Sequence, residues 1–368
     1  DKLWKEVEQA EKKSLPKTVI KLTDEIYQKG EKERNSAQML KAYMWRMKTQ
    51  DILTPDSFYV GLRDLEQWAK QTEQPMDRAI LHSLIAEFYA NYAADNQWQL
   101  RQRTEIVGET PSADIREWTA NMFVEKVRTN VKEALADSLL LLKTSSLNYI
   151  PFVELGETSE YYHHDMYHLL ASRAIRALNQ IERLERGSFN GITASPVKQD
   201  IINIYERMTD AYETAGLKEG YVLTMLQYLE WKRGNDNKLQ PVQLKKGLGE
   251  WTADTYNAAL DELKRQFKSE PICAEVYLAQ VRYAVKKMQQ VNALQLCDEA
   301  IRLYPGYRRI NALKNLREEI LAPFLNVSAV SQAFPNEEIK LNVGHKNLDG
   351  FTVRLYQAKK LVKEQHYS

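Results

Sequence analysis

The stretch that decides the fold runs from Ala274 to Pro305 and reads AEVYLAQVRYAVKKMQQVNALQLCDEAIRLYP. Apolar residues recur in it every three to four positions, in two runs, and this period predicts two helices joined by a tight turn. In the second run the small residues Ala293 and Ala300 lie two helical turns apart, where a partner helix can approach closely. Pro305 ends that helix, because a proline cannot continue the backbone hydrogen-bond ladder.

The alanines and the proline stand where a tetratricopeptide repeat (TPR) has its own, so this stretch resembles one TPR unit. A second, weaker hairpin of the same kind lies near the other end of the chain. Its first helix is expected over residues 3–14, and its second begins at Pro16, which suits the first turn of a helix. There Val19 and Ile26 repeat the spacing of seven residues. Both ends of the helical region therefore predict hairpins of a repeat array.

Helical periodicity continues between these two hairpins. Helices are expected at 36–50, 55–71, 75–94, 115–142, 160–187, 196–216, 221–231, 251–267 and 309–321. Together with the hairpins this gives about thirteen helices, with no strand before residue 322. Segments 95–113, 143–158 and 234–250 lack a sustained period and are expected to be irregular. Short connections favour antiparallel neighbours, so the prediction is an all-α, TPR-like superhelical array of antiparallel hairpins.

After Pro323 the apolar period changes from helical spacing to alternation, which is typical of strands. The alternating residues are Ile339, Leu341, Val343, Phe351, Val353 and Leu355. A turn is expected at 347–350 and an earlier strand around Val327. Two or three strands have too little core to stand alone, so they either pack on the helices or begin a further domain. We favour the second interpretation: a helical array over 1–322, then an incomplete β-sandwich over 323–368.

The bulk composition excludes several classes of protein. Lys plus Arg is 51 and Asp plus Glu is 50, and a net charge of +1 gives no broad footprint for nucleic acid. Only 14 Gly and 11 Pro argue against a large all-β domain. No segment approaches the ~20 apolar residues of a membrane span. Because the chain starts with Asp1, the absence of a visible signal peptide is uninformative.

The two cysteines, Cys273 and Cys297, allow at most one disulfide and form no CxxC pair. Cys297 falls on an apolar helical stripe, so it is expected to be a small core residue. This cysteine usage does not decide between cytoplasm and cell envelope.

Three features together resemble a known family. Helical hairpins, the segments IREWT at 115–119 and MYHLLASRA at 166–174, and a β start after a proline resemble the N-terminal part of large α2-macroglobulin-like proteins of Bacteroides-type bacteria. In that family a helical, TPR-like region precedes a string of β-sandwich macroglobulin domains. The tail 325–357 looks like the opening of the first such domain. The resemblance covers nearly the whole chain, but its motifs are packing motifs and speak for fold more than mechanism.

The resemblance implies a cell-envelope protein, periplasmic or on the outer-membrane surface, that traps or inhibits proteases. Many members carry a thioester built from a Cys and a Gln in a Gly-Cys-Gly-Glu-Gln type motif. Neither Cys273 nor Cys297 stands in such a motif. The resemblance therefore implies that this chain contributes support, spacing, docking or partner binding, and not the covalent chemistry.

The sharpest local pattern is HHDMYH at 163–168. On the expected helix His164 and His168 are one turn apart, a spacing that lets two imidazoles reach one metal ion. Compared with HExxH, Asp165 replaces the Glu and would withdraw the general base from a metal-bound water. Glu160 or His163 could be a third ligand. The alternative is a polar helix N-terminus with surface side chains, and we favour it, so no catalytic residue, metal or cofactor is predicted.

Four aromatic residues do not fall on a helical stripe: Trp98, Tyr161, Tyr162 and Trp231. They could form a stacking platform for a sugar or a peptide, or be partly buried between helices, which we favour. The sequence shows no Gly-rich phosphate loop, no dinucleotide fingerprint and no defensible Ser-His-Asp order.

The leading hypothesis is a non-enzymatic scaffold or protein-interaction region of a cell-envelope α2-macroglobulin-like protease inhibitor. The alternative is a stand-alone TPR-type adaptor that binds a peptide, a protein or a glycan on its concave face. Both expect a protein or peptide partner, which includes other domains of the same chain, and neither expects nucleic acid. A His-dependent metalloenzyme is a distant third.

Overall fold

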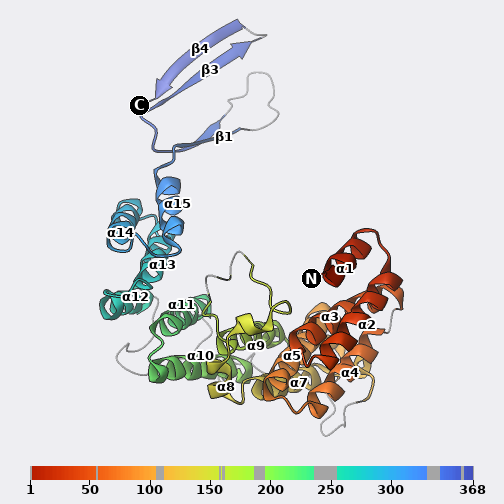
Figure 1. The fold of residues 1–368 in the computed structure, drawn as a ribbon. Helices are drawn as coiled ribbons and strands as arrows, with labels where there is room; N and C mark the ends of the chain where they lie inside the picture. Colours follow the sequence, from red (N-terminus) through yellow and green to blue (C-terminus); the bar gives the residue numbers. More distant parts are fainter. Residues whose placement is uncertain are drawn as a thin grey trace. The chain divides into compact units, whose positions relative to one another are not determined.

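The computed structural model describes residues 2–54, 57–104, 112–156, 159, 162–185, 195–235, 255–329, 340–357 and 360–367. In these ranges it has fifteen α-helices and four short β-strands (Figure 1). The chain divides into two compact units, Asp1–Tyr256 and Asn257–Ser368. The predicted helical class with a short C-terminal β segment is confirmed at this level.

The first unit is helical throughout its described part. Its α-helices are α1 (Lys2–Lys12), α2 (Pro16–Lys32), α3 (Ser36–Leu53), α4 (Ser57–Gln71), α5 (Pro75–Asp95), α6 (Gln97–Gln102), α7 (Ala120–Ala134), α8 (Ser138–Lys143), α9 (Met166–Ile181), α10 (Pro196–Ala215) and α11 (Lys218–Asn235). Short 3-10 turns are η1 (Ile115–Glu117), η2 (Ser146–Tyr149) and η4 (Glu182–Leu184). Pro16, Pro75 and Pro196 each stand at a first helical position, where the missing N–H has no intrahelical partner to lose.

Successive long helices of this unit alternate between two layers. In one layer α1 meets α3 through Trp4, whose Nε1 donates to Gln38 Oε1 at 2.7 Å. Next, α3 meets α5 through Ser36, whose hydroxyl donates to Asp77 Oδ2 at 2.5 Å. The series continues from α5 to α9 and from α9 to α11, as described below. We call these five helices the A layer.

The other four long helices, α2, α4, α7 and α10, form the B layer. The rings of Tyr27 on α2 and Trp68 on α4 meet edge to face, with centroids 5.9 Å apart. The Nζ of Lys126 on α7 lies 2.6 Å from Glu66 Oε1 on α4. An A helix followed by a B helix therefore forms one antiparallel hairpin, and the hairpins stack side by side.

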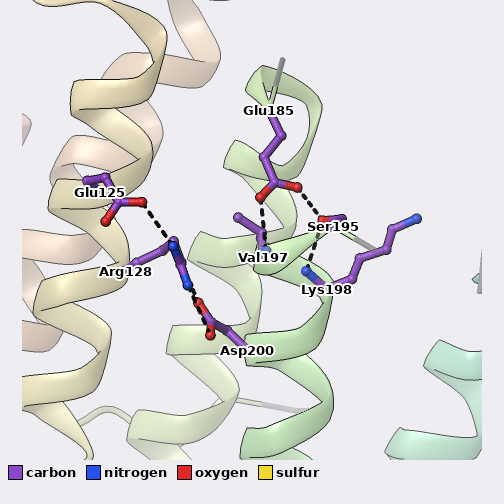
Figure 2. A network of polar contacts seen from close by, with 7 residues as sticks. All are labelled: Glu125, Arg128, Glu185, Ser195, Val197, Lys198 and Asp200. Carbon is purple, nitrogen blue, oxygen red and sulfur yellow. Dashed lines mark hydrogen bonds and ion pairs between the residues drawn. The ribbon is translucent and has the colours of Figure 1, made fainter. Parts of the chain in front are cut away.

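The B-layer contact between α7 and α10 is a network of polar side chains (Figure 2). Figure 2 shows Arg128 between Glu125 and Asp200, with its Nε 2.6 Å from Asp200 Oδ2 and its Nη1 2.9 Å from Glu125 Oε1. The hydrogen bond to Asp200 raises the pKa of the guanidinium, so the charge is fixed. Nearby, Glu185 accepts from the backbone N–H of Val197 at 3.0 Å and caps the start of α10.

Close approach between α10 and α11 depends on one glycine. A Cβ built on Gly220 would lie 2.5 Å from the ring of Tyr212 on α10. No real Cβ makes such a contact, so only glycine lets α11 pack here without a shift of the tyrosine. Because Tyr212 also belongs to the buried polar cluster described below, this contact helps to hold that cluster in place.

The second unit begins with four helices. They are α12 (Thr255–Phe267), α13 (Cys273–Lys286), α14 (Gln290–Leu303) and α15 (Ile310–Leu321). The hairpin predicted from the stretch 274–305 is α13 and α14. Ala293, Cys297 and Ala300 are fully buried on α14, as their stripe predicts. Both cysteines of the chain are buried and free.

Two β-hairpins follow. β1 (Phe324–Ala329) pairs antiparallel with β2 (Leu341–Lys346), and β3 (Phe351–Gln357) pairs antiparallel with β4 (Lys360–Tyr367). Strand β4 was not predicted, and Ile339 lies outside the described residues. The turn expected at 347–350 connects the two hairpins, and the strands on either side of it belong to separate sheets. Large apolar side chains such as Val327, Leu341 and Tyr356 are exposed.

The single long helix expected over 115–142 is wrong. The chain there forms η1, α7 and α8, because contacts made by two residues interrupt the helix. Trp118 is extended, its ring stacks on Tyr89 at 5.3 Å and its Nε1 donates to Ser112 O at 2.7 Å. Asp137 caps α8 by accepting from the N–H of Leu140. The irregular segment expected at 95–113 includes the short helix α6, and residues 105–111 lie outside the described part.

No helix in the described part of the chain is long and apolar enough to cross a membrane.

Candidate functional site

The candidate site is the solvent-facing side of three neighbouring A-layer helices, α5, α9 and α11. We call it the A-layer face and define it by Glu87, Asn91, Arg173, Arg176, Asn179, Gln180, Gln227 and Trp231, all half-buried or exposed. On α9 these residues fall at spacings of three and four, so they lie along one side of the helix.

The contacts between α5 and α9 are polar. Arg173 forms an ion pair with Glu87, and one turn further along α5 the Nε2 of Gln180 donates to Asn91 Oδ1 at 2.9 Å. Glu87 and Asn91 are one turn apart on α5, and Arg173 and Gln180 are two turns apart on α9, so each pair lies on one side of its helix. The result is a polar ladder that fixes the register of the two helices.

The contacts between α9 and α11 continue this ladder. The Nε2 atoms of Gln227 and His168 lie 3.2 Å apart, and the indole Nε1 of Trp231 donates to Asn179 Oδ1 at 3.1 Å. Trp231 also lies against Tyr205 of α10, with ring centroids 6.2 Å apart. Trp231 is therefore partly buried, as we favoured from the sequence, and its edge remains part of the A-layer face.

A buried carboxylate lies at the start of α9, at the edge of this face. Asp165 is 3% exposed and caps the helix by accepting from the backbone N–H of His168 at 2.7 Å. The hydroxyl of Tyr212 donates to it at 2.8 Å, and His163 Nδ1 lies 2.6 Å from its Oδ2. Burial and the charge of Asp165 raise the pKa of Tyr212, which keeps the phenol protonated as a donor.

His168 lies in the core and cannot act as a surface ligand, so the surface position that we favoured for the side chains of this segment is wrong for His168, as it is for Asp165. Its side chain is 0% exposed, and the ring of Tyr162 meets it edge to face at 5.6 Å. Burial lowers the pKa of His168 to about 4, against the opposing attraction of Asp165. Its Nδ1 has no hydrogen-bond partner among the described residues. The imidazole is therefore neutral in the folded protein at neutral pH.

This burial predicts a pH dependence of stability. The pKa of His168 in the folded protein, about 4, is below the ordinary value of 6.5, so the unfolded chain binds the proton first. The stability associated with neutral His168 is fully present above pH ~6.5 and is lost as the pH falls towards 4. At about pH 5 the loss is about 2 kcal/mol. Tryptophan-detected urea unfolding at about pH 7.5 and pH 5 measures it.

The matched variant is His168→Leu, which keeps an apolar side chain of similar reach and cannot titrate. In this variant the drop in unfolding free energy between the two pH values should shrink by that same amount. A histidine signal in the wild-type NMR spectrum that is absent from the variant, and that titrates near pH 6.5, would contradict the buried, neutral state.

The metal-site geometry considered for His164 and His168 depends on a helix that includes both. Helix α9 begins at Met166, so His164 precedes it, and its carbonyl accepts from the N–H of Ser146 at 3.0 Å. Glu160 lies outside the described residues. In the part of the chain that the structure describes, no group of three or more His, Cys, Asp or Glu side chains could hold a metal ion.

The four aromatic residues singled out in the sequence do not form one platform. Trp98 is 75% exposed on α6, so the partial burial that we favoured is wrong for it, and Tyr162 lies against His168. Trp231 belongs to the A-layer face, while Tyr161 lies outside the described residues. Sequence reasoning therefore found one residue of the face. It missed the arginine and amide ladder, whose only signal was polar residues at spacings of three, four and seven on otherwise apolar helices.

Comparisons with protein-family models, with curated proteins and with solved structures give no match to the chain.

Proposed function

We propose that the chain is a non-enzymatic scaffold that binds a protein or peptide on its A-layer face. The observation that carries this proposal is the continuous row of arginine, amide and indole groups across α5, α9 and α11. The most reactive groups nearby are committed to packing, because Asp165 caps α9 and His168 is buried. What remains accessible can recognise a partner, and no step of chemistry is assigned to it.

The finer fold assignment belongs to the same proposal. Stacked antiparallel hairpins with all first helices in one layer are the arrangement of TPR-like superhelices, whose concave surfaces bind partners. The two layers of the first unit and the α13–α14 hairpin of the second unit support this assignment. The A layer would line the concave side.

The wider setting is also a proposal. We place the chain in the N-terminal region of an α2-macroglobulin-like protease inhibitor of the cell envelope. The exposed apolar side chains of β1 to β4 support this, because two separate hairpins lack a core of their own and suit the opening of a β-sandwich. A gene that continues into many β-domains after Ser368 would agree with it, and a stop codon there would leave the adaptor hypothesis.

Site-specific photocrosslinking tests the scaffold proposal. A photoreactive phenylalanine analogue at Asn179, on the A-layer face, is compared with the same analogue at Asn203, exposed on α10 in the B layer. In a cell-envelope extract the Asn179 position should give discrete adducts that the Asn203 position does not give. Identical adduct patterns from the two positions, or none from Asn179, would refute the A-layer face as the binding surface.

A further inference from the structure

The charges on the A-layer face do not balance. Two carboxylates on or next to it are each committed to an arginine: Glu87 pairs with Arg173, and Glu230, beside Trp231 on α11, pairs with Arg233 three residues later. Asp95 at the end of α5 is exposed. Helix α9 and the turn η4 that follows it add two arginines that Glu87 and Glu230 do not neutralise.

Those arginines are Arg176 and Arg183. Both are exposed, and neither side chain forms an ion pair with any residue that the structure describes. Another guanidinium is brought close, because Arg101 Nη2 of α6 donates to the carbonyl of Arg183 at 2.9 Å. The end of α9 and the turn η4 therefore carry an excess of positive charge, although the whole chain has a net charge of only +1.

We propose, resting on the proposed function, that the A-layer face and the adjoining turn η4 bind an extended acidic peptide segment, with its carboxylates on Arg176 and Arg183. Arg176 is on α9, and Arg183 comes seven residues later in the 3-10 turn η4 that follows it, which is about 10 Å at the rise of a helix. An extended segment rises by about 3.3 Å per residue, so carboxylates about three residues apart match that separation. Arginine suits this role because its planar fork binds a carboxylate through two hydrogen bonds.

The groups that flank the arginines suit a peptide backbone. Asn179, Gln227 and Asn91 each use one group in the contacts between helices. A side-chain amide has two donors and an acceptor with two lone pairs, so each retains capacity for a peptide N–H or carbonyl. Trp231 adds an apolar edge beside Asn179.

The small number of these arginines argues against nucleic acid as the ligand. A phosphate backbone needs a row of lysines and arginines along its length. Two arginines match a few carboxylates in a peptide and disfavour a polyanion.

Fluorescence anisotropy with the full chain tests this inference. The probe is a fluorescein-labelled peptide of four Glu-Ser-Gly repeats, compared with Gln-Ser-Gly and Lys-Ser-Gly peptides of equal length and with a thymidine oligonucleotide. We expect wild-type protein to bind the acidic probe best and to lose affinity as sodium chloride rises. The R176E/R183E double variant should bind the acidic probe at least about tenfold more weakly.

The matched control is Arg207→Glu, an exposed arginine on α10 in the B layer, which should change the affinity by less than about twofold. Circular dichroism establishes that both variants fold. Equal binding of the neutral peptide, an unaffected double variant, binding of none of the peptides, or tighter binding of the oligonucleotide would each overturn the inference. Adducts at Asn179 that persist in R176E/R183E would leave the scaffold proposal standing while the acidic preference falls.

Discussion

Replacing Asp165 by alanine should lower the free energy of unfolding of the first unit by about 4 kcal/mol. This carboxylate makes two stabilising interactions. It caps α9 through the N–H of His168 at 2.7 Å, and it is the acceptor for the buried hydroxyl of Tyr212 at 2.8 Å. Loss of a cap costs about 1 kcal/mol, and a buried hydroxyl left without an acceptor costs about 1 to 3 kcal/mol. The lost partner of His163 and the small cavity add to this.

The structure offers a matched control in Asp137. It caps α8 by accepting from the N–H of Leu140 at 3.0 Å, but it is exposed and no tyrosine depends on it. Asp137→Ala should therefore cost only the cap, about 1 kcal/mol. All seven tryptophans precede residue 252, so tryptophan fluorescence in urea follows the first unit in both variants. Equal losses would mean that the contact between Asp165 and Tyr212 contributes nothing beyond capping.

The sequence predicted those elements whose signals are local. The α13–α14 hairpin follows from an apolar period and from Pro305, and both helices lie where the period predicts them. The proline at the start of α2 also marks its first turn. These signals work because helix formation and termination depend on neighbours along the chain.

The failures have a different physical origin. The period over 115–142 suggests one helix, yet the break at Trp118 depends on stacking against Tyr89, which lies on another helix. The position of Asp165 before an apolar run is a readable cap signal, whereas its partner Tyr212 is 47 residues away. Contacts between helices leave no trace in the spacing of a single sequence.

The A-layer face depends both on local spacing, which the sequence shows, and on contacts between helices, which it does not. Its residues occupy polar positions that a helical period identifies, but which helices bring them together depends on the stacking order of the hairpins. Arg173 meets Glu87, 86 residues away, and Trp231 meets Asn179, 52 residues away. Sequence reasoning could thus predict a polar face on α9 without predicting its partners, and the candidate site became definable only with the fold.

The second large effect is expected in the second unit, where Glu275→Ala should cost about 3 to 5 kcal/mol. Glu275 Oε1 lies 2.6 Å from Arg309 Nη1 and accepts from the hydroxyl of Tyr307 at 2.9 Å, and all three residues are buried. The two donors, Tyr307 and Arg309, lie in the connection between α14 and α15. The carboxylate of Glu275 therefore anchors that connection to α13. Without it, a guanidinium stays in the interior without its carboxylate.

The exposed pair Arg317 and Asp298 provides the comparison, with Nε and Oδ1 2.6 Å apart. Asp298→Ala should cost less than about 1 kcal/mol, because water screens that pair. The second unit has no tryptophan, but its two buried cysteines, Cys273 and Cys297, become reactive only when it opens. The rate of thiol labelling in urea therefore measures this unit separately from the first.

A double variant decides whether the charge pair itself stabilises the unit. Methionine at both Glu275 and Arg309 removes the charges together and fills a similar volume, so its cost should be well below that of Glu275→Ala. That outcome would assign the damage in the single variant to an arginine that is buried without its carboxylate. If the double variant labels as fast as the single one, the pair and its hold on Tyr307 are themselves what keeps α13 and α15 together.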